Sequence, residues 1–157
     1  GKTFNFAMEF GASDKMLVRK TGMAPSDVMR MRAAWKGLFS GASTWMDRQQ
    51  FQHNGEWVED AFGRRMRLPE QRENVEYNER AFQAHVGKCA VNYPIQGTAA
   101  SIVKRGMLMV AEQGADLRLQ VHDEYLVDGP WEPPEGLVAI HPELPTPFEV
   151  KSGPVWS

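Results

Sequence analysis

A short alternating pattern at residues 117–127 constrains the fold more than any other feature of the chain. Apolar and polar residues alternate over 117–121, and a second apolar run follows over 125–127. A period of two is typical of a strand with one buried face. Only His122, Asp123 and Glu124 separate the two runs, so the connection is a tight turn. The sequence therefore predicts an antiparallel hairpin with acidic residues at its tip.

Helical spacing of apolar residues dominates the chain before this hairpin. A smaller hairpin is expected over 56–68, and Pro94 is expected to separate two helices because proline has no N–H for a helix interior. The helices are predicted from Gly1 to about Phe10, from Pro25 to about Phe39 and on to about His53, from about Asn74 to Asn92, and from about Gln96 to Gln113.

Prolines shape the C-terminal part. Six of the ten prolines lie between Pro130 and Pro147, which excludes a long helix there and predicts an irregular crossing of the surface. A short strand is expected over Phe148 to Val150. Mainly helical order followed by an antiparallel sheet predicts the α+β class, and 157 residues are enough for one hydrophobic core.

Composition excludes several classes of protein. No apolar run approaches the roughly 20 residues that a membrane helix needs. The single cysteine, Cys89, forms no intramolecular disulfide, which favours a reducing compartment. We therefore expect a cytoplasmic protein. The chain begins with Gly1 instead of Met, so we expect a processed or truncated polypeptide.

Charge is distributed unevenly along the chain. Residues 1–110 hold 16 Lys and Arg against 11 Asp and Glu, whereas residues 111–157 hold 2 against 9. One interpretation is that the basic part faces a polyanion and the acidic C-terminal part holds cations. An ordinary solvated surface is the other.

Adjacent carboxylates in the late hairpin are the strongest chemical signal. Asp123 and Glu124 project oxygens from a rigid turn, and oxygen ligands suit a hard cation such as Mg²⁺. The structural alternative is that Asp123 is there only because Asp favours turns.

Two further patterns suggest ligand contacts. Lys2, Phe6 and Phe10 share one helical stripe, where an ammonium and two rings can bind a nucleotide; the alternative is a core helix with a snorkelling Lys. Asn92 and Gln96 flank Pro94, and their amides can contact base edges; the alternative is that they cap neighbouring helix ends.

These elements together resemble the C-terminal part of the family A DNA polymerases. The resemblance rests on four segments in the family's order, and the end of the chain, residues 149–153 with Trp156, is also similar to the family's terminal strand. The four segments are the fingers-helix pattern of residues 2–11, Phe62-Gly63-Arg64-Arg65 with Leu68-Pro69, the run from Asn92 to Ala100, and Gln120-Val121-His122-Asp123-Glu124.

The resemblance implies DNA-templated DNA synthesis, in which a primer 3′ hydroxyl attacks a deoxynucleoside triphosphate with two Mg²⁺ ions in the complete enzyme. It divides the chain into the C-terminal part of the fingers, residues 1–53, and a palm portion, residues 54–157, of an incomplete polymerase fold. The implied partners are primer–template DNA, a dNTP and an upstream palm and thumb segment, with no membrane. The implied location is the cytoplasm of a bacterial cell or a phage-infected host.

Residue roles follow from the same resemblance. Asp123 would hold the metal ions, with Glu124 in support, and both count as candidate catalytic residues. The implied nucleotide and DNA contacts are Lys2 with the phosphates, Phe6 with the sugar, Phe10 near the template base, Asn92 and Gln96 with the minor groove, Arg64, Arg65 and Lys88 near the nucleic-acid backbone, and His122 near the primer end.

The chain also departs from the family. Ser101 stands where members usually have Asp, and the proline-rich residues 130–147 are expected to replace a helix of the family. The sequence begins inside the fingers helix, so the second metal-binding Asp is absent. Because two-metal transfer needs both cations held, we expect no useful polymerase activity from this polypeptide alone. The alternatives are a catalytically inactive nucleic-acid-binding or assembly subunit and an RNA polymerase relative.

Overall fold

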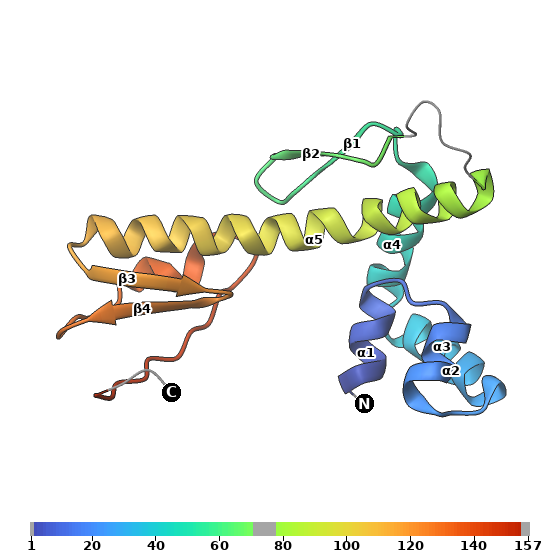
Figure 1. Ribbon diagram of the computed structural model, residues 1–157, viewed down its shortest axis with the longest axis horizontal. Helices are drawn as coiled ribbons and strands as arrows, with labels where there is room; N and C mark the ends of the chain where they lie inside the picture. The colour runs from blue at the N-terminus through green and yellow to red at the C-terminus, as the bar shows by residue number, and fades with distance from the viewer. Residues whose placement is uncertain (1, 71–77, 155–157) are drawn as a thin grey trace. The chain divides into compact units, whose positions relative to one another are not determined.

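The computed structural model describes residues 2–70 and 78–154 (Figure 1), with the side chain of Lys2 outside the described part. The chain forms two units, Gly1–Gly97 and Thr98–Ser157, which are taken in turn. The mixture of helices with small antiparallel hairpins confirms the α+β class.

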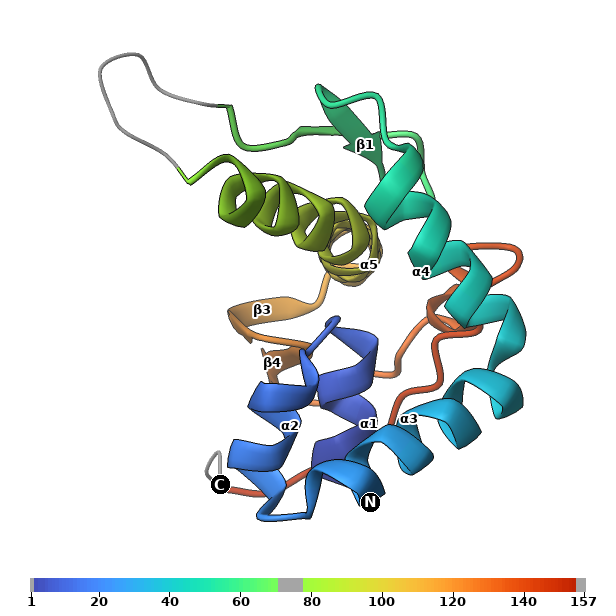
Figure 2. The same ribbon diagram turned by 90° about the vertical axis from the view of Figure 1, so that its right-hand side faces the viewer.

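Four helices build the first core. The helices are α1 (Lys2–Glu9), α2 (Asp14–Thr21), α3 (Pro25–Leu38) and α4 (Ser40–Gln52), and Figure 2 shows the first three lying together. Three of them were expected, with Pro25 in the first turn of α3 as its sequence suggests. Their buried side chains are Phe4, Met8, Ala12, Leu17, Val28 and Trp35.

Helix α2 was not predicted from the sequence, although both of its ends are marked. The side chain of Ser13 accepts a hydrogen bond from the Met16 N–H, as an N-cap does. Gly22 ends the helix with φ of 70°, a left-handed conformation that glycine adopts without a steric penalty. A serine N-cap followed nine residues later by a glycine C-cap is therefore the sequence signal that would have located α2.

The small hairpin forms as expected and packs on a long helix. Strands β1 (Trp57–Glu59) and β2 (Arg65–Arg67) pair antiparallel, with Val58 opposite Met66. The helix beneath them is α5 (Glu79–Glu112). Its start was expected at about Asn74, but residues 71–77 lie outside the described part. Between hairpin and helix the buried residues are Val58, Leu68, Val86, Cys89 and Ala90.

The expected break at Pro94 is wrong, because α5 runs through it without interruption. Proline cannot donate to the Ala90 carbonyl and costs about 3 kcal/mol in a helix interior. The hairpin offsets this cost by packing on both sides of the proline. Its Val58 and Leu68 bury Ala90, and its Met66 lies over Gly97 one turn beyond. Tertiary packing thus keeps the helix continuous where local propensity would end it.

The second unit holds the late hairpin. After α5 come β3 (Asp116–Val121) and β4 (Glu124–Asp128), paired antiparallel as predicted, with an irregularity in register between Leu117 and Leu119. A short 3₁₀ helix, η1 (Glu135–Ala139), follows. Val110 and Leu137 are buried in this unit.

The proline-rich stretch behaves as expected except at its end. Residues 130–147 contain the short η1 and one isolated β-bridge between His141 and Leu144. The strand expected over Phe148 to Val150 does not form, since residues 148–150 have no regular secondary structure. Alternating Phe148 and Val150 suit a strand face, but a strand also needs a ladder partner, and the described strands pair only within the two hairpins. No helix in the described part is long and apolar enough to cross a membrane.

Candidate functional site

Helix α1 presents two aromatic rings to solvent while a different pair of residues forms its core face. Phe6 and Phe10 are 52% and 36% exposed, whereas Phe4 and Met8 are 4% and 2% exposed. The two exposed rings stack with centroids 6.3 Å apart and planes 14° apart. Because the core is made by Phe4 and Met8, the core interpretation of the Phe6 and Phe10 stripe fails. The stripe is instead a flat apolar surface open to a ligand.

A buried carboxylate organises the loop of the small hairpin. Asp60 is 5% exposed, and its Oδ1 accepts hydrogen bonds from the N–H groups of Phe62 and Arg64, both over 2.9 Å. Gly63 takes φ of 77°, which fits glycine at that place in the turn. Sequence reasoning missed Asp60. Its signal was an Asp three residues before a Gly, the pattern of a turn stabilised by its own side chain.

The two arginines after this turn have different surroundings. The Nε of Arg64 lies 3.4 Å from Asp60 Oδ2. The guanidinium of Arg65 lies over the Trp57 ring at 4.1 Å and pairs with Glu59 at 3.2 Å. The side chains of Arg64 and Arg65 are 47% and 67% exposed, so both remain partly open to solvent.

Gly97 brings this hairpin against the part of α5 that contains Gln96. A Cβ at position 97 would lie 2.5 Å from the Met66 Sδ and 3.3 Å from an Arg64 Nη. Only glycine allows the two side chains to cross the helix so closely. The Gly-Arg-Arg segment and the segment around Gln96, separated by about thirty residues in sequence, therefore share one surface.

The polar residues expected on α5 lie at steps of four along it. Lys88 and Gln96 are exposed, and Asn92 between them is half-buried. Asn92 Oδ1 is buried and has no hydrogen-bond partner among the described residues. Because α5 is continuous, Asn92 and Gln96 stand inside a helix and cap no helix end. The capping alternative is therefore wrong.

A buried cysteine lies beside this polar row. The Sγ of Cys89 is 3.7 Å from His85 Nε2, one turn earlier. One turn later, the hydrogen bond between Tyr93 and Cys89, together with burial, raises the pKa of Tyr93 above its usual 10.0. The Cys89 thiol thus contacts a side chain on each flanking turn.

In the second unit, the late hairpin exposes all three of its predicted residues. His122 takes φ of 52°, the positive value that a two-residue hairpin loop requires at its first position. The carbonyl of His122 accepts a hydrogen bond from Gln120 Nε2 over 2.5 Å. Asp123 and Glu124 are both exposed. Behind them, the Tyr125 hydroxyl donates to the Val103 carbonyl over 2.5 Å, anchoring the hairpin on α5.

The fit of this tip to Mg²⁺ is partial. Two adjacent carboxylates are suitable ligands for a hard cation. However, among residues 2–70 and 78–154 no three His, Cys, Asp or Glu side chains gather in one place. A metal ion bound at this tip would therefore need further ligands besides these two carboxylates.

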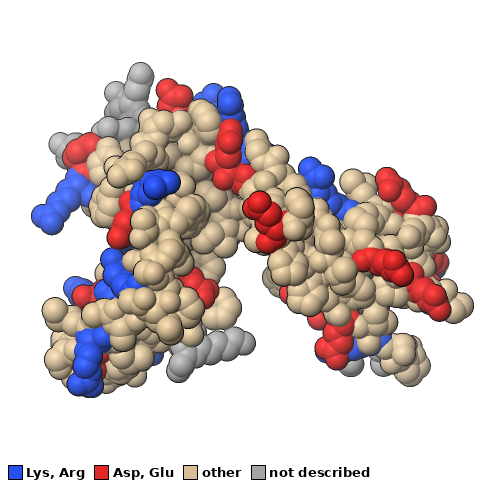
Figure 3. Space-filling view, turned by 180° about the vertical axis from the view of Figure 1, so that it is seen from behind, with Lys and Arg blue, Asp and Glu red and all other residues tan. Residues whose placement is uncertain are grey.

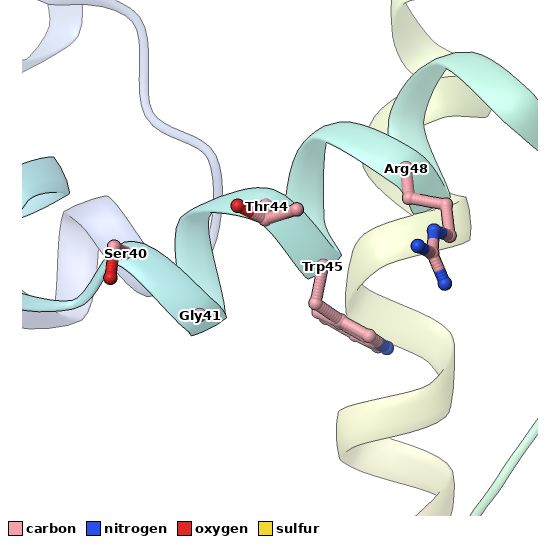
Figure 4. A pocket seen from close by; sticks show the side chains of 5 residues that line it. All are labelled: Ser40, Gly41, Thr44, Trp45 and Arg48. Carbon is pink, nitrogen blue, oxygen red and sulfur yellow. The ribbon is translucent and has the colours of Figure 1, made fainter.

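A shallow depression on α4 was not expected from the sequence. Figure 4 shows Trp45 and Arg48 projecting from the same side of the helix. The lining residues are Ser40, Gly41, Thr44, Trp45 and Arg48.

Charge differs between the two units. Residues 1–97 hold 14 basic and 11 acidic residues, and residues 98–157 hold 4 and 9. Figure 3 shows acidic side chains gathered over the part that contains β3 and β4. The basic excess thus lies in the unit that contains Arg64, Arg65 and Lys88.

Comparison with known proteins gives consistent similarities. The sequence model of DNA polymerase family A matches residues 1–143. DNA polymerase I of Pseudomonas aeruginosa is 33% identical over 134 residues, covering 81% of this chain and 14% of that protein. The thermostable DNA polymerase I of Thermus aquaticus is 28% identical over 165 residues, covering 97% of this chain and 19% of that protein.

A solved structure is similar in fold. It is the POL domain of Pol1 from M. smegmatis in complex with DNA primer-template and dNTP, with a TM-score of 0.67 and 26% identity. The match covers 81% of this chain and 23% of that one. The chain thus spans less than a quarter of the length of each relative named here.

Proposed function

The chain belongs to DNA polymerase family A, and on this premise we propose that it forms the fingers and palm portion of an enzyme for DNA-templated DNA synthesis. In this proposal residues 1–53 are the C-terminal part of the fingers and residues 54–157 belong to the palm. The observation that carries the proposal is the exposed stack of Phe6 and Phe10 on a helix whose core face is made by other residues.

This stack would bind the incoming dNTP. A flat apolar surface suits a sugar and a base, which bury area against aromatic rings. Phe6 would pack on the sugar, Phe10 would lie near the template base, and Lys2, at the start of α1, would pair with the phosphates. The family similarity and the related domain that holds DNA primer-template and dNTP support these roles.

The surface formed by the hairpin and α5 would bind the primer–template duplex. Arg64, Arg65 and Lys88 would lie near its backbone, because phosphate contacts fix the register of a protein on DNA. Asn92 and Gln96 would reach the minor groove, where amides donate to or accept from base edges. Gln96 is exposed, which supports this role, whereas the Oδ1 of Asn92 is buried in the described part of the chain.

The tip of the late hairpin would hold Mg²⁺. Asp123 would be the ligand and Glu124 would support it, with His122 near the primer end. Magnesium supplies charge stabilisation for the phosphates during transfer. Because the described residues gather no three ligands, a carboxylate from an upstream palm segment of the same polymerase would complete the site.

Primer extension tests this proposal. The chain is mixed with Mg²⁺, dNTPs and a primer–template, alone and with a polypeptide that contains the palm and thumb of a family A polymerase. We expect templated extension only from the mixture, and we expect Asp123→Asn to abolish it while duplex binding persists. Glu143→Gln, which removes an acidic charge elsewhere in the second unit, is the matched control.

Three results would count against the proposal. Robust extension by the chain alone would show that it needs no second carboxylate. Full activity of Asp123→Asn would indicate a nucleic-acid-binding or assembly role in place of catalysis. Preference for ribonucleotides in competition would point to RNA synthesis.

A further inference from the structure

Asp60 holds its carboxylate where a charged group is rarely found. Its side chain is fully buried, and a buried carboxylate is costly unless hydrogen bonds and an opposite charge compensate it. Here the compensating groups belong to the loop that presents Arg64. We propose that Asp60 is a positioning residue that sets the guanidinium of Arg64 for contact with the phosphate backbone of a duplex. This inference rests on the proposed function.

The contacts of Asp60 fix both the backbone and the side chain of Arg64. Oδ1 accepts the Arg64 N–H over 2.9 Å, and Oδ2 lies 3.4 Å from Arg64 Nε. The main chain closes the same loop, because the Asp60 N–H donates to the Arg64 carbonyl over 3.0 Å. The carboxylate of Asp60 therefore fixes both the backbone position of Arg64 and the direction of its side chain.

This arrangement leaves the other edge of the guanidinium for a ligand. Arginine has five N–H donors, and Asp60 faces the one on Nε. An Nη of Arg64 lies 3.8 Å from Met66 Sδ, a weak acceptor that a phosphate oxygen would replace. The Arg64 side chain is 47% exposed, so a phosphate can approach the terminal nitrogens. Phosphate oxygens bind such a fork of donors in a bidentate manner.

The test variant is Asp60→Asn in the full chain, with binding to a primer–template duplex measured over a range of salt concentrations. Asparagine keeps an oxygen for the backbone N–H groups of the loop, but its NH₂ would face the Nε donor of Arg64 and turn the guanidinium away. We expect duplex affinity to fall about three- to tenfold at low salt. The slope of log affinity against log salt should become less steep by about 0.9, the value for one lost phosphate contact.

The direction of this effect separates positioning from general electrostatics. Removing an acidic charge ordinarily strengthens DNA binding. Glu59→Gln is the matched control, because Glu59 is the adjacent acid in the same hairpin and pairs with Arg65 instead. We expect Glu59→Gln to bind the duplex as tightly as the parent or more tightly. Equal or tighter binding by Asp60→Asn would overturn the proposal.

A double-mutant cycle tests whether Asp60 acts through Arg64. In an Arg64→Gln background, Asp60→Asn should change duplex affinity by less than a factor of two, because the positioned group is already gone. An undiminished loss in that background would show that Asp60 acts by another route and would overturn the proposal.

A readout without DNA separates this inference from the proposed function. The Nε–H of Arg64 should give a distinct, slowly exchanging ¹⁵N resonance that Asp60→Asn shifts and broadens while Glu59→Gln leaves it in place. If the parent chain shows that resonance but binds no duplex, the positioning geometry stands and the proposed function fails. If Asp60→Asn leaves the resonance unchanged, the positioning proposal fails.

Discussion

A Cβ at Gly106 would lie 2.6 Å from the hydroxyl oxygen of Tyr125. This hydroxyl donates to the Val103 carbonyl on the same helix, so the absence of a side chain at Gly106 lets β4 lie directly on α5. Asp123, at the tip of the hairpin, lies two residues before Tyr125. The position of the proposed metal ligand in the second unit therefore depends on a glycine far from it in sequence.

Gly106→Ala should destabilise the parent chain and cost much less in a Tyr125→Phe background. The added methyl collides with the tyrosine hydroxyl, and overpacking costs about 1–3 kcal/mol. Removing the hydroxyl frees most of that space, although Ile140 Cδ1 remains 3.1 Å away. Urea unfolding of the four chains measures the coupling, expected at about 1 kcal/mol. Additive effects would contradict the contact.

Alkaline pH should destabilise the chain through two half-buried tyrosines. Burial raises the pKa of Tyr125, and a hydrogen bond with Cys89 followed by burial raises that of Tyr93. A raised pKa means that the unfolded chain releases the proton first. The contribution of these two tyrosines to the free energy of unfolding should therefore be constant below about pH 10, the ordinary tyrosine value, and fall as pH rises through the folded-state pKa.

Urea titrations from pH 8 to 11 measure this fall, with Tyr125→Phe as the comparison. The variant loses one titrating group, so its free energy of unfolding should decline less steeply above pH 10. An unchanged pH profile in Tyr125→Phe would show that Tyr125 ionises as easily in the folded chain as in the unfolded one.

Substitutions on the two faces of α1 should have opposite consequences. Phe4→Ala removes a buried ring from the first core and should cost about 3–5 kcal/mol in urea unfolding. Phe6→Ala removes a half-exposed ring and should change stability by less than about 1 kcal/mol. In the reconstituted polymerase, Phe6→Ala should raise the KM for dNTP. A large loss of stability in Phe6→Ala would place that ring in the core.

Two glycines of α5 should separate stability from binding. At Gly97 a methyl meets the flexible end of Met66, so Gly97→Ala should change the free energy of unfolding by less than about 1 kcal/mol while weakening duplex binding through Arg64. At Gly87 a methyl lies 3.0 Å from the backbone oxygen of Gln50, so Gly87→Ala should cost about 1–3 kcal/mol. Equal losses of stability at both positions would contradict this distinction.

Patterns that repeat within a few residues were predictable. The late hairpin, α1, α3 and α4 each follow from apolar periodicity with turn or cap residues at the ends, and the structure confirms them. Helix α2 was missed although Ser13 and Gly22 mark its two ends. The roles assigned to Asp123, Phe6 and the hairpin arginines stay predictions.

By itself, the sequence determined the class of the fold and the family, since periodicity and ordered motifs are local properties of the chain. The tertiary structure alone decided that α5 continues through Pro94, that Phe4 and not Phe6 is buried, and that Asp60 holds Arg64. The physical reason is the same in each case. Burial and close packing depend on neighbours that are distant in sequence. The free energy of packing outweighs the local preference of Pro94 to end a helix, and it decides which of the apolar residues on α1 are buried.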